Sequence, residues 1–388
     1  GGQDDVTVLV DGDAVDRLRA GLAEDEAGRD GHARRLERPG EFVEFRLCVR
    51  LNLVELLLEV LVLLLLAVLL LIGIGGCDGG GGVTTAPPEE EPDPVLVPQT
   101  MNLSGALQDV HDPAIIAAHG QYYLYSTGGG IQWRSSADLT AWEYRGDVLG
   151  GVPPWAEDIT EGDLWAPDAA YFNDRYHLYY SASTFGSSRS AIGLATTPTL
   201  SPDSANYGWE DQEQVIESVE ADPYNAIDPN IITDQEDRIW MAFGSYNDEG
   251  IHLRRINPET GMASSQDETF YNIADRPDTD PNAIEAPYII QHDGYYYLFV
   301  SWGSCCPGPD GSSDYNIRVG RSESVTGPYV DQSGTAMTDG GGTLVLESFG
   351  KWQGTGHNSV LQADGETMLV YHAYNTNQSN TPYLRISP

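Results

Sequence analysis

The sequence predicts an all-β protein: a five-bladed β-propeller preceded by an N-terminal hydrophobic export segment and a Gly/Pro/Glu linker. From about residue 101, short runs rich in Tyr, Ile and Val alternate with turns of Gly, Asp, Asn and Pro, and no long helical period occurs. In the same region a unit of two strands joined by a turn recurs five times. A repeat of this size built from short strands is typical of a propeller, which forms one sheet per repeat.

The N-terminal part of the 388 residues divides into three segments. Residues 1–50 are a charged extension to which we assign no role, and residues 51–77 are hydrophobic, with an almost unbroken run of Leu, Val and Ile shortly before Cys77. Basic residues, an apolar run and small residues before a cysteine resemble a bacterial lipoprotein signal. A transmembrane anchor is the alternative, because the stretch counted from Leu51 is about long enough to span a bilayer.

Both interpretations predict that the protein is exported, as a cell-surface lipoprotein, a membrane-anchored protein or a secreted protein. Contact with a membrane is expected only through this segment. Residues 78–100 form a flexible linker, since Gly supplies flexibility while Pro and like charges extend a chain. Residues 101–388 form the propeller domain.

The five repeated units share a start at a proline or its equivalent. These starts are His111-Asp112-Pro113, Trp165-Ala166-Pro167, Ile227-Asp228-Pro229, Glu285-Ala286-Pro287 and, in a weaker copy, His357-Asn358-Ser359. Aligned on the proline, with Ser359 in its place in the last copy, the units lie 54, 62, 58 and 72 residues apart. The first strand of each blade lines the central channel of a propeller, so we expect the five starts to surround one end of that channel.

Composition excludes some partners. The formal net charge is −39, from 59 acidic and 20 basic residues, so nucleic acid and anionic membrane surfaces are repelled. Lys351 is the single lysine, which fits either a protein adapted to high salt or a GC-rich coding sequence. Four cysteines do not form a disulfide scaffold, and the adjacent Cys305 and Cys306 are either free thiols or a strained loop disulfide.

Three acids, Asp112, Asp228 and Glu285, stand at or beside the aligned starts of three different blades. Asp-Pro also begins ordinary turns, and we interpret Asp168 as a structural acid of that kind. Like charges gathered around a channel cost free energy unless they perform chemistry or bind a cation. Carboxyls in this arrangement suit glycosidic hydrolysis, in which one is a protonated acid and another an ionised base.

The neighbours of these acids suggest how the roles are divided. The apolar residues around Glu285 favour a raised pKa and the acid role, which leaves Asp112 as the base. Asp228 would then keep the acid protonated and oriented.

The order of several short motifs resembles glycoside hydrolase family 43, in particular its endo-α-1,5-L-arabinanases. The resemblance covers residues 107–388 and includes the stretches around Asp112, Trp165, Phe185, Asn225, Asp228, Glu285, Cys305-Cys306 and His357. It implies a five-bladed propeller and an inverting mechanism with Asp112 as base, Glu285 as acid and Asp228 as the residue that adjusts the pKa. It also implies that His357 contacts a cation in the channel, usually calcium, directly or through water. Because calcium prefers oxygen ligands, a mostly water-bound ion is expected.

The resemblance also suggests how substrate is held. Trp165 and Phe185 resemble aromatic platforms on which sugar rings stack, and Asn225 belongs to the matching motif before Asp228. We expect a monomer whose partner is the polysaccharide arabinan of plant pectin, cleaved internally. The sequence ends at Pro388, so the fifth blade is expected to lack its outer strand, and no β-sandwich domain follows, which favours the endo-arabinanase. The alternatives are an exo-acting α-L-arabinofuranosidase or β-xylosidase on the same fold, and a non-catalytic carbohydrate-binding propeller.

Overall fold

A computed structural model describes residues 98–246, 249–363 and 365–388 of the protein. The charged extension, the hydrophobic export segment and nearly all of the linker lie outside the described residues, so those predictions are not tested by it. Within the described ranges, no helix is both long enough and apolar enough to cross a bilayer. The fold below concerns the domain formed by these ranges.

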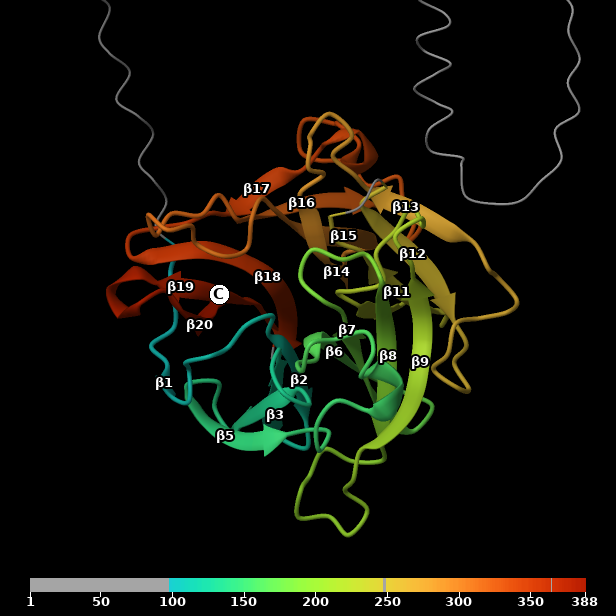
Figure 1. Cartoon of the computed structure of the whole chain (residues 1–388), viewed down its shortest axis with the longest axis vertical. Helices are drawn as coiled ribbons and strands as arrows, with labels where there is room; N and C mark the ends of the chain where they lie inside the picture. Colours follow the sequence, from blue (N-terminus) through green and yellow to red (C-terminus); the bar gives the residue numbers. More distant parts are fainter. Residues whose placement is uncertain (1–97, 247–248, 364) are drawn as a thin grey trace, which may run out of the picture. The chain divides into compact units, whose positions relative to one another are not determined.

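Five sheets follow one another in chain order around a common centre, which confirms the five-bladed propeller (Figure 1). Blade 1 contains β2 (Ala114–Ala118), β3 (Gln121–Ser126), β4 (Gln132–Ser136) and β5 (Ala141–Asp147), with the short β1 (Ser104–Gly105) parallel to β5. Blade 2 contains β6 (Trp165–Phe172), β7 (Arg175–Ala182), β8 (Ser190–Thr197) and β9 (Glu210–Ser218). Blade 3 contains β10 (Asn230–Thr233), β11 (Ile239–Phe243), β12 (Ile251–Ile256) and β13 (Phe270–Ala274).

The last two blades differ in size. Blade 4 contains β14 (Ile284–His292), β15 (Tyr295–Trp302), β16 (Asn316–Ser322) and β17 (Thr343–Leu346). Blade 5 contains the three named strands β18 (Trp352–Ala363), β19 (Glu366–Asn375) and β20 (Thr381–Ser387). Three short 3₁₀ helices, η1 (Pro154–Ala156), η2 (Met337–Asp339) and η3 (Thr376–Gln378), lie between strands.

A separate apolar core fills each junction between neighbouring blades. Tyr123 and Leu178 belong to the core between blades 1 and 2, and Trp240 and Leu298 to the core between blades 3 and 4. The middle strands therefore lose the simple alternation of buried and exposed residues: all eight residues of β8 are buried. A sheet covered on both faces needs apolar or small residues on both, which explains the near-continuous hydrophobic runs.

Each innermost strand is preceded or interrupted at its start by one residue with a left-handed backbone. These residues are Asp112 (φ 52°), Ala166 (φ 41°), Asp228 (φ 58°), Ala286 (φ 55°) and His357 (φ 46°). Residues other than glycine rarely adopt positive φ, so the same conformation in all five blades marks equivalent positions. In blades 2, 4 and 5 this residue lies in a β-bulge, and we call the five positions the bulge ring.

The bulge ring corrects the alignment of the last repeat. The sequence alignment paired Ser359 with the prolines, which would put His357 at the position of Glu285. The structure pairs Asn358 with the prolines and His357 with Asp112 and Asp228, because His357 is the residue with positive φ. The last copy has no proline, so nothing in the sequence marked the position of its bulge, and the alignment was shifted by one residue.

The chain between residues 101 and 108 joins the two ends of the ring. The Met101 amide donates to the Ile386 carbonyl, and the Leu384 amide donates to the Leu107 carbonyl. The same stretch contains β1, which pairs with β5 of blade 1. It therefore bonds both to the outermost strand of blade 5 and to blade 1.

Candidate active site

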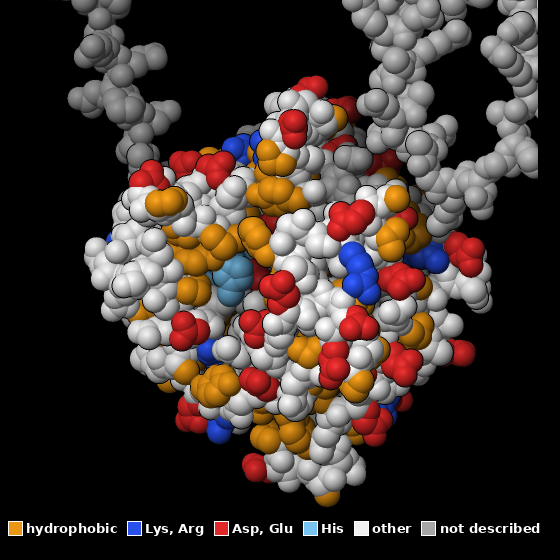
Figure 2. Space-filling model, viewed as in Figure 1, with side chains coloured by type: hydrophobic (Ala, Val, Ile, Leu, Met, Phe, Trp, Pro, Cys, Tyr) orange, Lys and Arg blue, Asp and Glu red, His pale blue; other side chains and the backbone are white. Residues whose placement is uncertain are grey.

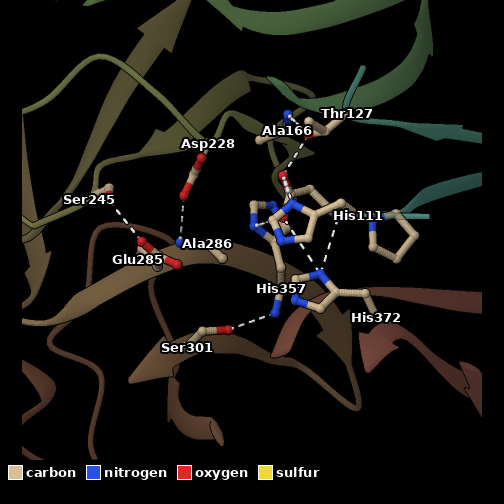
Figure 3. Close-up of polar contacts among 12 residues, drawn as sticks. His111, Thr127, Ala166, Asp228, Ser245, Glu285, Ala286, Ser301, His357 and His372 are labelled. Atoms are coloured by element: carbon tan, nitrogen blue, oxygen red, sulfur yellow. Dashed lines mark hydrogen bonds and ion pairs between the residues drawn. The ribbon is translucent and has the colours of Figure 1, made fainter. Parts of the chain in front are cut away.

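Asp112, Asp228 and His357 come from three positions of the bulge ring, and Glu285 immediately precedes a fourth. Figure 3 shows Asp228 and Glu285 opposite the histidines 111, 357 and 372, with the side chains directed toward one region between the innermost strands. The three carboxyls predicted from the repeats are thus brought together. In the face seen in Figure 2, a histidine and acidic side chains are visible in a hollow among apolar side chains.

Asp112 is buried and held by three neighbours. Its Oδ2 lies 2.8 Å from Nδ1 of His111 and accepts a hydrogen bond of 2.5 Å from the Thr127 hydroxyl, and its Oδ1 lies 3.0 Å from Nδ1 of His357. Burial alone would raise the pKa of Asp112, but His111 and His357 hold it well below its usual value. Asp112 is therefore ionised throughout the neutral range, as a general base requires.

The backbone of Asp112 is fixed as well. Its amide donates to Nδ1 of His372 at 3.1 Å, so this histidine must be neutral, with its proton on Nε2. His372 is fully buried, and its ring stacks on His111 with centroids 4.2 Å apart. Burial lowers the pKa of His372 well below the usual value, in agreement with the neutral form.

Asp228 connects two blades. Its amide donates to the Ser181 hydroxyl at 2.9 Å, and its Oδ2 accepts the amide of Ala286 at 3.1 Å. Burial raises the pKa of Asp228 to about 7, with an opposing effect of His357 and a further increase from Glu285. Burial thus raises the pKa of Asp228 in the same direction as that of Glu285 beside it.

Glu285 has two hydroxyl partners. Ser245 donates to Oε2 at 2.9 Å and Tyr315 to Oε1 at 2.6 Å. Burial raises the pKa of Glu285, although Tyr315 and His357 oppose the shift. A glycine makes this contact possible: a Cβ on Gly356 would stand 1.9 Å from the Tyr315 ring. Asp112 and Glu285 thus hold their protons in different pH ranges, which is the requirement for a base and an acid in one site.

His357 offers little to a hard cation. Its Nδ1 is engaged with Asp112, so one nitrogen, Nε2, remains. Among the described residues, the groups of three or more side chains able to hold a metal do not include His357. The donor set therefore fits an ion held mainly by water, and only when His357 is neutral. The Asp112 carboxylate opposes that state: burial would lower the pKa of His357, but Asp112 and Asp228 raise it to about 9.

The three predicted substrate contacts lie in different surroundings. Trp165 is half-buried. In the strand register it lies opposite Ser181, just as Glu285 lies opposite Ser301, so Trp165 occupies in blade 2 the place that Glu285 occupies in blade 4. Phe185, in the turn after β7, is 88% exposed. Asn225 is buried and its side-chain oxygen has no hydrogen-bond partner.

Asp168 is structural, as predicted. It is buried, and its Oδ2 accepts hydrogen bonds from the Ile231 amide and the Asn230 side chain, joining blades 2 and 3.

Sequence reasoning missed several residues that hold the site. Thr127 and Ser301 occupy equivalent places at or just after the end of the second strand of their units, and a hydroxyl recurring there was a usable signal. Ser245 lies one residue beyond the equivalent place in blade 3, so it was not part of that signal. Tyr315 lies outside the repeated motifs, and His372 within a strand, so neither stood out in the sequence.

A propeller that holds a carboxyl of lowered pKa and a carboxyl of raised pKa at one end of its channel has the side chains that a glycoside hydrolase needs for acid and base catalysis. The chain belongs to glycosyl hydrolases family 43, whose model matches residues 106–387. Membership confirms the family suggested by the motifs.

Relatives of known activity cover most of the domain. The extracellular exo-α-(1→5)-L-arabinofuranosidase ArbA of Cellvibrio japonicus is 42% identical over 73% of this chain and 84% of its own length. The extracellular endo-α-(1→5)-L-arabinanase 1 of Bacillus subtilis is 37% identical over 72% and 84%. Among solved structures, the family 43 endo-arabinanase from Bacillus licheniformis is 40% identical, with a TM-score of 0.67 over 74% of this chain and 95% of that one. The arabinanase of Cellvibrio cellulosa complexed with arabinohexaose is 40% identical, with a TM-score of 0.68 over 72% and 92%.

Proposed function

We propose that this protein hydrolyses α-1,5-linked L-arabinan with inversion at the anomeric carbon, cutting within the chain. The observation that carries the proposal is the opposite displacement of two pKa values in one site: that of Asp112 is lowered and that of Glu285 is raised. In this mechanism Asp112 takes a proton from water while Glu285 gives one to the leaving oxygen. Asp228 orients the Ala286 amide beside the acid and keeps Glu285 protonated by repulsion between their charges.

The substrate and the site of action rest on the relatives. Both the exo-acting and the endo-acting relatives named above are described as extracellular and act on α-(1→5)-linked L-arabinose. Export agrees with the hydrophobic segment, which we interpret as a lipoprotein signal in preference to a plain membrane anchor. In this proposal Trp165 and the exposed Phe185 would stack against sugar rings and Asn225 would make a polar contact, in a monomeric enzyme.

A cation, calcium in the first instance, would lie near Nε2 of His357 and supply positive charge close to the carboxyls. This proposal has support from the family resemblance and from the single free nitrogen of His357. The ion competes with the proton on His357, so it binds better at higher pH.

The test combines one substitution with two product analyses. Replacing Glu285 by Gln keeps its shape but removes the acid, so kcat on linear arabinan should fall by at least about 100-fold while oligosaccharide binding persists. Early product collected from the wild type should show the inverted anomer by NMR, and a ladder of oligosaccharides should precede arabinose. A variant with more than about a tenth of the wild-type kcat, or a retained anomer, excludes the mechanism. Release of a single short product from the chain end would assign the exo-acting alternative.

A further inference from the structure

The two adjacent cysteines lie beside the base. Cys305 and Cys306 follow β15, and one thiol or ring nitrogen from each of His111, Cys305 and Cys306 lies within 4.8 Å of the others. The Tyr374 hydroxyl is 3.3 Å from Sγ of Cys306 and 2.6 Å from Nε2 of His111. Both cysteines are free thiols. We call these four side chains the thiol cluster.

The thiol cluster is held in place from several directions. The Ser304 amide donates to Asp314 at 2.9 Å, and the Ser313 hydroxyl donates to the Ser304 carbonyl at 2.8 Å. Gly354 (φ 60°) permits close approach from blade 5, because a Cβ there would stand 2.7 Å from the Cys305 carbonyl oxygen. The loop that carries both thiols is therefore fastened beside β18.

His111 is oriented as a metal ligand would be. Asp112 occupies its Nδ1, so Nε2 is the nitrogen directed toward the thiols, and the imidazole is fixed by a carboxylate on its far side. Histidines that bind metals usually have such a carboxylate partner on their second nitrogen. Two thiolates and an imidazole are soft or intermediate ligands, which select zinc-like or monovalent copper ions over calcium and magnesium.

We propose that Cys305, Cys306 and His111 form a binding site for one thiophilic cation of the zinc class, with the Tyr374 hydroxyl or water as a fourth ligand. Binding releases the two thiol protons and the Nε2 proton of the imidazolium form of His111 to solvent, and it forms two metal–sulfur bonds and one metal–nitrogen bond. A disulfide between the two cysteines would need a strained ring.

The position of this cation next to His111 has a consequence for the base. A metal on Nε2 polarises the imidazole and strengthens its bond to Asp112, so the carboxylate becomes a weaker base. Zinc should therefore inhibit hydrolysis reversibly. This consequence rests on the proposed function, whereas metal binding itself does not.

Cadmium serves as a spectroscopic substitute for zinc in the test. The full chain carries Cys48→Ser and Cys77→Ser, so that only the two thiols of the cluster remain, and it is reduced before use. Titration with Cd²⁺ should produce thiolate-to-metal charge-transfer absorption that saturates at one ion per chain, is reversed by Zn²⁺ and is unaffected by excess Ca²⁺. Cys305→Ser and Cys306→Ser should each weaken binding by at least about tenfold. Ser312→Ala, in the same loop but bonded to Asp310, should bind like the parent.

Activity and thiol protection separate the possible outcomes. Zinc should inhibit the parent and Ser312→Ala but not Cys306→Ser, which should otherwise hydrolyse arabinan normally. If a serine variant fails to fold, the parent still answers the question, since bound zinc should protect two thiols per chain from a thiol reagent. Absence of the charge-transfer absorption, unchanged affinity in both serine variants, or fewer than two titratable thiols after reduction would overturn the site. Metal binding without any arabinan hydrolysis would retain the site and reject only the proposed function.

Discussion

Asp112 and Glu285 face the same end of the channel but change protonation at different pH, and single neighbouring side chains cause the difference. Two histidines stabilise the charged form of Asp112, while the burial of Glu285 disfavours its charged form. Tyr315 works against that burial, because its hydroxyl donates to the carboxylate and so stabilises the ionised acid.

Replacing Tyr315 by Phe should therefore raise the pKa of Glu285 further. The alkaline limb of the kcat/KM profile, where Glu285 loses its proton, should move to higher pH, and the acidic limb should stay. The measurement is kcat/KM on linear arabinan across pH. Tyr329→Phe is a matched control, since Tyr329 is also buried but donates to the Val325 carbonyl in blade 4. An alkaline limb that moves to lower pH, or moves equally in the control, contradicts this role of Tyr315.

His357 acts on all three carboxyls in the same direction. Its positive charge lowers the pKa values of Asp112, Asp228 and Glu285. In His357→Gln the pKa values of base and acid should both rise, so both limbs of the kcat/KM profile should move to higher pH and kcat should fall.

The same residue tests the proposed cation. A calcium-selective chelator should lower activity and shift the pH optimum of the wild type in the same direction, most strongly at high pH, where His357 is neutral. It should have almost no further effect on His357→Gln. Equal responses of the two proteins would show that the ion acts elsewhere, and no response of the wild type at any pH would remove the ion from the mechanism.

At the scale of strands, the bulge ring is stabilised by side chains from the preceding blade. In four blades a side chain accepts a hydrogen bond from the backbone amide of the left-handed residue in the next blade. The pairs are Thr127 with Ala166, Ser181 with Asp228, Ser301 with His357, and His372 with Asp112. In blade 3 the equivalent residue is Gly244, which has no side chain, and Asp228 itself accepts the Ala286 amide. Asp228 thus helps to join the blades, in addition to the chemical role proposed for it.

Ser181→Ala should leave the buried amide of Asp228 without an acceptor, which costs about 1–3 kcal/mol of the free energy of unfolding. Denaturant unfolding followed by tryptophan fluorescence measures this loss. Ser333→Ala, at an exposed turn, is the control and should change stability by less than about 0.5 kcal/mol. Activity should also fall in Ser181→Ala because Asp228 is displaced. Equal stability of the two variants would argue against the acceptor role.

The bulge ring also shows how far the sequence could be read. Proline identified four of its five positions, because it directly follows the left-handed residue in four blades and recurs at a regular distance. The fifth position lacks proline, and its alignment was wrong by one residue. The three candidate carboxyls were found because repeats place equivalent residues together. Tyr315 and the partners of His111 could not be found, because contacts between loops and strands of different blades leave no periodic signal.

For the whole molecule, charge is the dominant property. From residue 101 onward there are 40 acidic and 12 basic residues, a net charge of −28. Acidic side chains are scattered over the face seen in Figure 2, with few basic ones between them. Repulsion among exposed charges is screened by salt, since the Debye length decreases from about 10 Å at 0.1 M to about 3 Å at 1 M.

Molar NaCl should therefore raise the Tm of the protein, by about 2 °C for each kcal/mol of repulsion relieved. A thermal scan at 0.1 M and 1 M NaCl measures the effect. His357→Gln should respond as the wild type does, because surface screening does not involve the channel. If the Tm is the same at both salt concentrations, the low lysine content is better explained by a GC-rich coding sequence than by adaptation to salt. The enzymatic assignment would be unchanged.

The stretch between residues 101 and 108 has a consequence for how the chain acquires its structure. Its Gln108 side chain bonds to Tyr383, which is 275 residues away in the chain, while strands within each blade are joined by much shorter connections. Local hairpins can thus form early, whereas the contact that completes the circle must wait for both ends to meet. Contacts of such long sequence separation slow folding. Four of the five junctions join blades that are consecutive in the chain, so the junction between blades 1 and 5 is the one that needs both ends of the domain to be present.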